Sequence, residues 1–287
     1  MQLKDQLFDF KYLNKDLAYT DTESGDATIL FLHGMGCNSY IWYPIVQNLK
    51  ATHRCITLDF PGSGKSTQSE KKLSLHMLSE NVISLIEHLS ITHQELYIVA
   101  HSMGAQVAII TALKKRINIK KLILLAPAGL EEFNDFQKKG IMNSLSLLSL
   151  APLGNQLFNQ VIKPFLTATD TSIQTILNRV EKGISNENLK QYRKNIIEST
   201  EAMLNEPVSD KLNLLDLPVH IVYGTKDKMI PNPLYHTTST ENFASNALKS
   251  FKNATLEMIP NKGHFLPLEA VNETINSIKK SIEQNTM

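Results

Sequence analysis

The stretch Leu96-Tyr97-Ile98-Val99-Ala100-His101-Ser102-Met103-Gly104 decides the fold of this chain. Its apolar first half predicts a buried strand, and residues 106–113, which follow it, have the composition of a helix. A serine flanked by small residues at such a junction is typical of a nucleophile held on a sharp turn. Ala100 stands where that pattern usually has glycine, and Gly104 is expected to let the helix approach the sheet closely. The alternative is a serine in a small-residue turn that takes no part in chemistry.

Short apolar runs of the same kind recur along the chain with helical segments between them. They lie at residues 28–32, 55–58, 121–125, 219–223 and 255–259. Two of the segments, residues 73–89 and 267–284, carry apolar side chains at helical spacing. Continuous apolar strands that alternate with helices predict a mostly parallel sheet with helices on both faces. The expected fold class is therefore α/β.

Five of the apolar runs lead into loops that contain reactive or turn-forming residues. These loops are His33-Gly34-Met35-Gly36, Asp59-Phe60-Pro61-Gly62-Ser63-Gly64, the serine turn, Gly224-Thr225-Lys226-Asp227 and Gly263-His264. In open α/β sheets, ligand sites gather outside the carboxyl ends of the strands. We therefore expect these loops to meet at one edge of the sheet and to form one site.

The segment from residue 127 to residue 208 interrupts this alternation. It contains no convincing strand but has helix-like stretches at residues 133–150 and 188–204. We expect these residues, 127–208, to form a helical cap inserted into an α/β core made of residues 1–126 and 209–287. The leucine- and serine-rich residues 142–150 fit either a buried helix or one wall of an apolar pocket.

Three loops supply the parts of a serine-based catalytic triad. A serine hydroxyl is a weak nucleophile, so an imidazole must take its proton and a carboxylate must orient that imidazole. Asp227 follows the run 219–223, and His264 follows the run 255–259. The order Ser102, Asp227, His264 is that of one hydrolase architecture and differs from the two large serine protease families. Taken singly, Asp227 could cap a turn and His264 could be a surface histidine, but the agreement of three loops favours the triad.

Acyl transfer also needs donors for the oxyanion that develops on the substrate. The helix that starts after Ser102 offers the backbone N–H of Met103. The glycines on either side of Met35 allow its N–H to turn toward the same point. His33 is expected to bond to the loop backbone rather than to act as a base.

Composition excludes several other classes of function. The 287-residue chain carries 29 basic and 28 acidic side chains, so no overall charge favours nucleic acid or an anionic membrane. Neither Cys37 nor Cys55 lies in a metal-ligand spacing, and no apolar stretch is long enough for a membrane span. The stretch Gly62-Ser63-Gly64-Lys65-Ser66-Thr67 looks like a phosphate-binding loop, but Asp59 occupies the place of its first glycine. We expect a cytoplasmic protein without metal or cofactor, and its oligomeric state is left open.

Together these loops resemble the signature loops of the α/β-hydrolase superfamily, specifically its capped serine hydrolases, in the family's order. The matching stretches are His33-Gly34-Met35-Gly36, residues 59–66, His101-Ser102-Met103-Gly104, residues 224–231 and Gly263-His264-Phe265. The resemblance implies Ser102 as nucleophile, His264 as general base and then acid, and Asp227 as its orienting carboxylate. It implies Met35 and Met103 as oxyanion donors and the cap as the part that shapes substrate choice. Dehalogenase and epoxide hydrolase relatives use an aspartate nucleophile, so Ser102 argues against both.

The leading hypothesis for the reaction is hydrolysis of a carboxylic ester with a small-to-medium acyl group or of a monoacylglycerol-like lipid. It rests on a cap rich in leucine and phenylalanine, including Leu157, Phe158, Phe165 and Leu166. The residues expected to touch the substrate are Met35, Met103, Leu147, Phe165 and Phe265.

Two other hypotheses stay open. The first is a carbon–carbon bond hydrolase of ring-cleavage dienoates. Relatives with that activity tend to have a tryptophan where Phe265 stands and an arginine near the substrate carboxylate, and the cap's only arginines are Arg179 and Arg193. The second is a non-catalytic receptor for a small ligand on the same fold.

Overall fold

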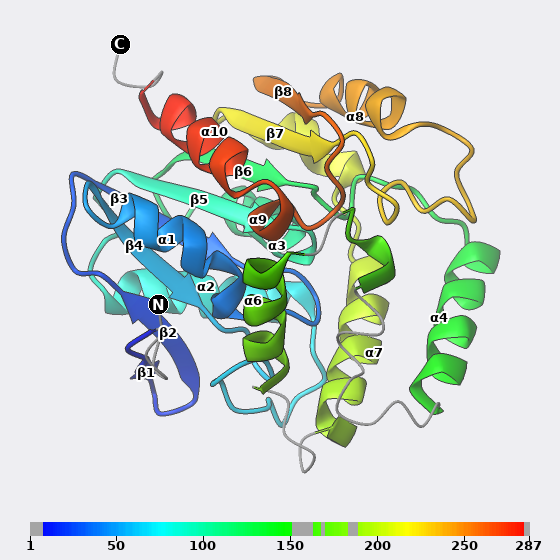
Figure 1. Cartoon of the computed structure of the whole chain (residues 1–287), viewed down its shortest axis with the longest axis horizontal. Coiled ribbons are helices and arrows are strands. Elements are labelled where there is room, and N and C mark those ends of the chain that lie inside the picture. Colours follow the sequence, from blue (N-terminus) through cyan, green and yellow to red (C-terminus); the bar gives the residue numbers. More distant parts are fainter. Residues whose placement is uncertain (1–7, 151–162, 168–169, 183–188, 284–287) are drawn as a thin grey trace.

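The structure is a computed structural model that describes residues 8–150, 163–167, 170–182 and 189–283, without the side chains of residues 147–150. Its centre is an eight-stranded sheet in the order β1-β2-β4-β3-β5-β6-β7-β8 (Figure 1). The strands are β1 (Lys11–Leu13), β2 (Leu17–Asp21), β3 (Ala27–Leu32), β4 (His53–Leu58), β5 (Leu96–His101), β6 (Ile119–Leu125), β7 (Val219–Gly224) and β8 (Ala254–Ile259). From β4 to β8 the neighbouring strands are parallel, whereas β1 and β2 pair in the antiparallel sense.

The predicted mostly parallel sheet is confirmed, and each of the six apolar runs forms one of its strands. β3 and β5 are buried along their whole length, which explains why their sequences are continuously apolar. The sequence did not indicate β1 and β2. β1 forms the edge of the sheet, where Tyr12 is 49% exposed and no apolar run is needed. β2 lies between β1 and β4 and is buried from Leu17 to Thr20, but it is short and its sequence mixes apolar and polar residues.

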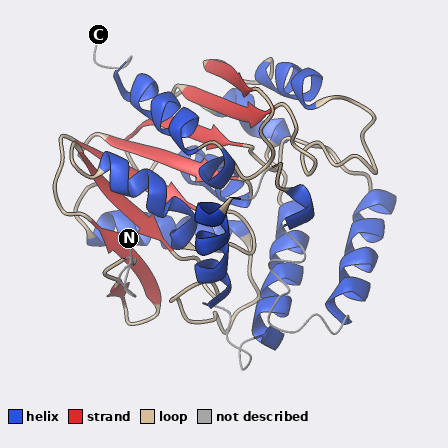
Figure 2. Cartoon of the chain, viewed as in Figure 1, coloured by secondary structure: helices blue, strands red, loops and turns tan. Residues whose placement is uncertain are grey.

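Helices cover both faces of the sheet (Figure 2). One face carries α1 (Tyr43–Leu49), α9 (Leu266–Glu269) and α10 (Val271–Glu283), and the other carries α2 (Leu75–His88), α3 (Met103–Leu113) and α8 (Thr240–Leu248). Successive side chains of β3 alternate between the two cores. Leu30 and Leu32 pack with α2 and α3, whereas Ile29 and Phe31 pack with α1 and α10. Each such buried side chain contributes about 1.5–3 kcal/mol of hydrophobic stabilisation.

Helix α3 crosses the middle of the sheet with almost no exposed surface. Its residues from Met103 to Ala112 are all buried, so it is apolar on every side. A Cβ on Gly104 would lie 2.5 Å from the carbonyl oxygen of Leu32 and 2.6 Å from that of His33. Only glycine fits this crossing, and it brings the start of α3 close to the end of β3.

The described residues of the segment 127–208 form helices and no strand, in line with the expected helical insertion. They are α4 (Asp135–Leu150), the 3-10 turn η3 (Lys163–Phe165), α6 (Thr171–Lys182) and α7 (Leu189–Asn205). The limits of the cap stay a prediction.

Hydrogen bonds tie α7 to the core. The Gln106 amide of α3 donates to the carbonyls of Met203, at 3.1 Å, and Glu206, at 2.8 Å. The Glu198 carboxylate accepts the N–H of Leu73 at 3.2 Å. Helix α7 is therefore tied to the core, and α4 packs against α7 on its outer side (Figure 1).

Candidate active site

Ser102 lies in the tight turn between β5 and α3, and its backbone adopts φ 52° and ψ −120°. This sparsely populated conformation costs on the order of 1–3 kcal/mol and persists where the surroundings hold it. Here the Ser102 N–H donates to the carbonyl of Leu125 at 3.0 Å. The Ser102 carbonyl accepts the N–H groups of Ala105, at 3.0 Å, and Ala128, at 3.2 Å. Ala100 is fully buried in β5, so its methyl group fits the position that usually holds glycine.

His264 and Asp227 form a buried pair at the same edge of the sheet. The His264 Nδ1 lies 2.9 Å from Asp227 Oδ2, and both side chains are almost fully buried. Asp227 Oδ1 accepts the N–H groups of Met229, at 2.8 Å, and Ile230, at 2.9 Å. Because a carboxylate only accepts hydrogen bonds, Nδ1 carries the proton and Nε2 keeps a lone pair. Nε2 is the nitrogen that a general base would use.

The two expected oxyanion donors occupy suitable backbone positions, although their role stays a prediction. Met103 is the first residue of α3, so its N–H is among those that find no acceptor within the helix. Met35 lies in a turn closed by the N–H of Cys37, which donates to Gly34 at 3.2 Å. The Met35 side chain accepts a hydrogen bond from the Thr200 hydroxyl of α7 at 3.2 Å.

His33 holds loop backbone, as expected from the sequence, and Asp59 does the same. The His33 Nδ1 donates to the carbonyl of Gly34 at 2.8 Å, and Nε2 accepts the N–H of Phe60 at 3.1 Å. Complete burial lowers the pKa of His33. Asp59 accepts the N–H groups of Ser39, at 2.7 Å, and Lys65, at 2.8 Å. The Lys65 N–H is thus occupied within the loop, which argues against a phosphate cradle.

His101 points away from the cavity but contacts the loop that carries His264. Its Nε2 donates to the carbonyl oxygen of His264 at 3.0 Å, and its ring packs against those of His264 and Phe265. Burial and the neighbouring His264 hold the pKa of His101 well below its usual value, so the ring is neutral. His101 therefore fixes the backbone on which His264 stands. No local sequence pattern predicts this contact, because it joins residues from two different strand ends.

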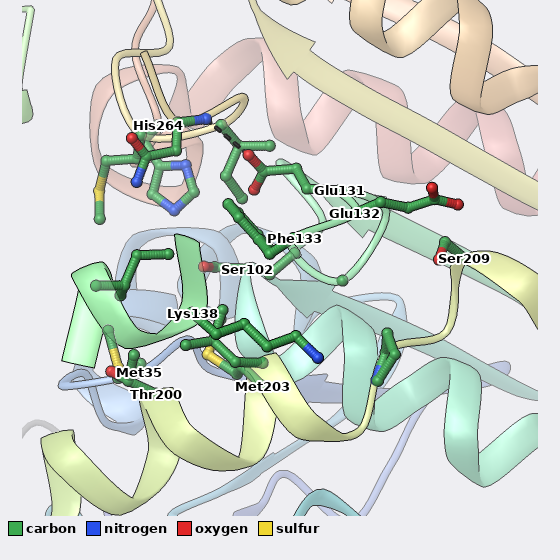
Figure 3. A pocket seen from close by; sticks show the side chains of 18 of the residues that line it. Met35, Ser102, Glu131, Glu132, Phe133, Lys138, Thr200, Met203, Ser209 and His264 are labelled. Atoms are coloured by element: carbon green, nitrogen blue, oxygen red, sulfur yellow. Dashed lines mark hydrogen bonds between the residues drawn. The ribbon is translucent and has the colours of Figure 1, made fainter. Parts of the chain in front are cut away.

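Ser102 and His264 line one cavity of about 410 Å³ (Figure 3). Its described wall also includes Met35, Ala128, Gly129, Glu131, Glu132, Phe133, Lys138, Ile141, Thr200, Met203, Leu204, Pro207, Ser209, Asp210, Met229, Ile230 and Asn232. In Figure 3, His264 and Glu131 lie on one side of Ser102, and Met35 and Met203 lie on the other. The wall comes from the core loops and from α4 and α7 of the helical insertion, so insertion and core enclose the cavity together.

The structure places the residues expected to touch substrate in different surroundings. Met35 lines the cavity, as expected. Met103 and Phe265 do not belong to its described wall, because the side chain of Met103 is 2% exposed in the core and that of Phe265 is 3% exposed against His101. Phe165 packs against the core on the α1 and α10 face of the sheet, and a Cβ on Gly263 would lie 3.0 Å from its carbonyl oxygen. Leu166 is likewise buried in that core. The side chain of Leu147 and the whole of Leu157 and Phe158 lie outside the described residues.

Sequence reasoning missed Glu131, which lines the cavity and is 9% exposed. The pKa of Glu131 is raised to about 7, chiefly by burial and also by the nearby Asp227, against the lowering effects of the Asn232 N–H and of His264. One signal could have found it, because Glu131 follows β6 at the edge where the other loops converge. The wall residues Thr200 and Met203 carried no such signal, since they depend on how α7 packs.

The described residues contain no cluster of three side chains suited to hold a metal ion. Cys37 and Cys55 are buried and unpaired, and burial raises the pKa of each thiol to about 12. Neither is a reactive thiolate. Within the described ranges, no helix combines the length and the hydropathy needed to cross a bilayer.

Several curated proteins are similar to this chain over most of its length. It is 28% identical over 251 residues to the dihydrolipoyllysine-residue acetyltransferase component of the acetoin cleaving system of Pseudomonas putida, covering 87% of this chain and 61% of that protein. It is 24% identical over 259 residues to monoacylglycerol lipase ABHD6 of Homo sapiens, covering 88% and 74%. It is also 24% identical over 266 residues to 2-hydroxy-6-oxononadienedioate/2-hydroxy-6-oxononatrienedioate hydrolase 2 of Pseudomonas putida, covering 90% and 88%. The chain thus spans less than two thirds of the first of these relatives.

Solved structures and a family profile agree on the fold. The esterase EaEST from Exiguobacterium antarcticum superposes with a TM-score of 0.77 at 18% identity, covering 93% of this chain and 95% of that one. The profile described as alpha/beta hydrolase fold matches residues 27–271. Since this match takes in most of the chain, the chain belongs to the alpha/beta hydrolase fold family.

Proposed function

We propose that this protein is a serine hydrolase that cleaves carboxylic esters with small-to-medium acyl groups through an acyl-enzyme on Ser102. One observation carries the proposal: the strained Ser102 turn opens into the same cavity as His264, whose Nδ1 is held by Asp227. We further propose that it acts in the cytoplasm, where the buried thiols Cys37 and Cys55 stay reduced.

In the proposed reaction, the Ser102 Oγ attacks the ester carbonyl while His264 Nε2 takes the hydroxyl proton. The backbone N–H groups of Met35 and Met103 would bind the oxyanion of the tetrahedral intermediate. His264 then gives the proton to the alcohol oxygen as the carbon–oxygen bond breaks and the alcohol leaves. A water molecule, deprotonated by the same imidazole, attacks the acyl-enzyme and releases the carboxylic acid.

The size and lining of the cavity support a small-to-medium ester. Its volume of about 410 Å³ lies in the lower part of the range of small-molecule pockets, roughly 300–1,000 Å³. Met35 and Met203 lie on the side of Ser102 away from His264, and Ile141 and Leu204 are further apolar residues of the described wall. An acyl chain would be buried there at a gain of about 0.8 kcal/mol for each methylene group.

Hydrolysis of a carbon–carbon bond in a dienoate is the second candidate, because one relative of similar identity is named for such a substrate. The charges on the cavity wall favour the ester. The acidic residues Glu131, Glu132 and Asp210 line the cavity, whereas Lys138 is the cationic side chain on its described wall. Arg179 and Arg193 are not part of that described wall. A dianionic dienoate would therefore meet repulsion near the reacting serine.

A panel of p-nitrophenyl esters from acetate to decanoate, assayed beside a ring-cleavage dienoate, tests the proposal. We expect ester turnover with kcat/KM greatest for short or medium chains and dienoate turnover at least about 100-fold slower, since mismatched charge costs several kcal/mol. Faster turnover of the dienoate would overturn the choice of ester. Saturable binding of either ligand without turnover would instead indicate a receptor.

A further inference from the structure

Glu131 is a buried carboxylate on the cavity wall that the triad mechanism does not use. Its side chain is 8% exposed, and it stands on the loop that follows β6. The Asn232 N–H donates to its Oε1 at 2.7 Å, and the His236 Nε2 lies 3.5 Å from the same oxygen. Isolated carboxylates are seldom buried without a structural or functional reason. These contacts account for one oxygen and leave the other to be explained.

The second oxygen of Glu131, Oε2, makes no hydrogen bond to any described residue, yet the residue lines the cavity. In Figure 3, one carboxylate oxygen of Glu131 takes the dashed hydrogen bond and the other points toward the space between His264 and Ser102. A ligand in that space would meet a fixed hydrogen-bonding atom. Its position is fixed because Oε1 is anchored to backbone.

The position of Glu131 assigns it to the alcohol part of an ester. A general acid must reach the leaving oxygen, so the alcohol part of the substrate lies on the side of His264. Glu131 shares that side, since Figure 3 shows it on the same side of Ser102 as His264 and the charges of Asp227 and His264 both influence it. The far side of Ser102, where Met35 and Met203 lie, is left for the acyl chain.

Resting on the proposed ester hydrolysis, we infer that Glu131 is a specificity-determining residue: it hydrogen-bonds a hydroxyl group of the alcohol part and disfavours alcohols that carry a carboxylate. The substrate class is therefore an ester of a neutral, hydroxylated alcohol. A hydroxyl can donate to Oε2 whether or not the carboxyl is ionised, so this hydrogen bond persists on both sides of neutral pH. An anionic alcohol gains no such contact and is repelled once the carboxyl is ionised.

The pKa of about 7 makes this repulsion dependent on pH. As pH rises through that value, Glu131 ionises, and an alcohol that carries a carboxylate is disfavoured more strongly. The charged and titratable groups that surround Glu131 or share its cavity are Asp227, His264, His236, Glu132, Lys138 and Asp210. A pH effect on the shared acyl-transfer step changes the hydrolysis of every ester alike, so it cancels in a ratio of two esters that share an acyl group.

A purely structural role for Glu131 is the competing explanation, because its Oε1 holds the loop that follows Asp227. Loss of that support would slow all esters by the same factor. A role in substrate choice changes the ratio between esters that share an acyl group and differ in the alcohol. The variant Glu131→Gln keeps an acceptor for the Asn232 N–H and a polar group toward the cavity, whereas Glu131→Leu keeps only the volume.

The experiment compares kcat/KM for butyrate esters of propanol, glycerol and glycolate in the wild type, Glu131→Gln, Glu131→Leu and, as control, Glu70→Leu at an exposed carboxylate outside the cavity lining. We expect the glycerol-to-propyl ratio to fall about tenfold in Glu131→Leu, as for loss of one buried hydrogen bond, and to change less than about threefold in Glu131→Gln and Glu70→Leu. Between about pH 6 and about pH 8 the glycolate-to-propyl ratio should fall about threefold in the wild type and stay level in Glu131→Gln.

An unchanged glycerol-to-propyl ratio in Glu131→Leu, with propyl butyrate still hydrolysed, would overturn the inference and leave the proposed function intact. A uniform loss on all three esters would assign Glu131 the structural role and equally overturn it. If the wild type hydrolyses none of the three esters, the proposed function itself fails. Circular dichroism of each variant checks its folding, and Glu131→Gln alone tests the pH arm if Glu131→Leu does not fold.

Discussion

The floor and the wall of the cavity are built in different ways. The floor consists of Ser102, Asp227 and His264, which stand on loops at one edge of the sheet and are buried within backbone hydrogen bonds. The wall includes side chains from α4 and α7 of the inserted segment, which are half-buried in places, such as Thr200 and Lys138. In the function that we propose, the sheet fixes the chemistry, and the packing of the insertion governs the choice of substrate.

This contrast gives an expectation for variants. Changes on the floor should lower kcat and leave KM nearly unchanged, because they act on interactions made in the transition state. Changes to the contacts that position the wall should raise KM and leave kcat nearly unchanged. They act on binding that is equally strong in the ground state and the transition state.

The largest effect is expected from Asp227→Asn. The amide would favour the wrong tautomer of His264, so kcat should fall by about 10⁴-fold with a nearly unchanged melting temperature. Steady-state ester hydrolysis and a thermal melt measure both quantities. Activity near that of the wild type would move the orienting carboxylate to another residue, with Glu131 as the first to examine.

The next effect is a loss of stability from a substitution at Gly104, where α3 crosses β3. Gly104→Ala should lower the free energy of unfolding by about 1–3 kcal/mol, because the new methyl group meets the carbonyl of Leu32. Denaturant unfolding measures it. The matched control in the cap is Gly140→Ala, where the nearest atom is the movable hydroxyl of Tyr235, and we expect stability to be equal or higher by up to about 1 kcal/mol. Equal losses in the free energy of unfolding at both positions would argue against tighter packing beneath the floor than in the inserted segment.

A smaller effect on kcat is expected from changing His101, which supports the backbone of His264. His101→Phe removes the donor to the His264 carbonyl and leaves a buried acceptor unpaired, so kcat should fall about tenfold with little change in KM. His101→Gln keeps an N–H donor and should retain more activity. A rise in KM with normal kcat would show that His101 acts on the wall instead.

The smallest effect is expected from changing Gln106, which joins α3 of the core to α7 of the wall. Gln106→Leu removes the two donors to the carbonyls at the end of α7, so this helix should shift slightly. We expect KM to rise about threefold and kcat to change less than about twofold, consistent with a loss of less than about 1 kcal/mol of uniform binding. A larger loss in kcat than in substrate affinity would show that α7 supports the chemistry directly.

The same contrast explains how far the sequence could be interpreted. The continuous apolar strands and the order of Ser102, Asp227 and His264 are local patterns, and the sheet brings their ends together by a general rule of topology. They were therefore accessible without a structure. The antiparallel β1 and β2 were not, since both are short and mix apolar with polar residues.

The cavity wall was largely inaccessible to such reasoning. Phe265 follows His264 and was expected to touch substrate, but its ring turns into the core against His101. Glu131 is close to neither Ser102 nor His264 in sequence, and its surroundings depend on the loop that contains Asn232. Side-chain direction and pairing between distant loops decide both cases, and periodicity carries no information on either.

The most direct test of the central claim is labelling with a fluorophosphonate, followed by mass spectrometry of the labelled peptide. The account predicts one label per chain, on Ser102, absent from Ser102→Ala and slower to form in Asp227→Asn. A label that persists in Ser102→Ala, or that lies on another residue of the wild type, would contradict the claim that Ser102 is the nucleophile.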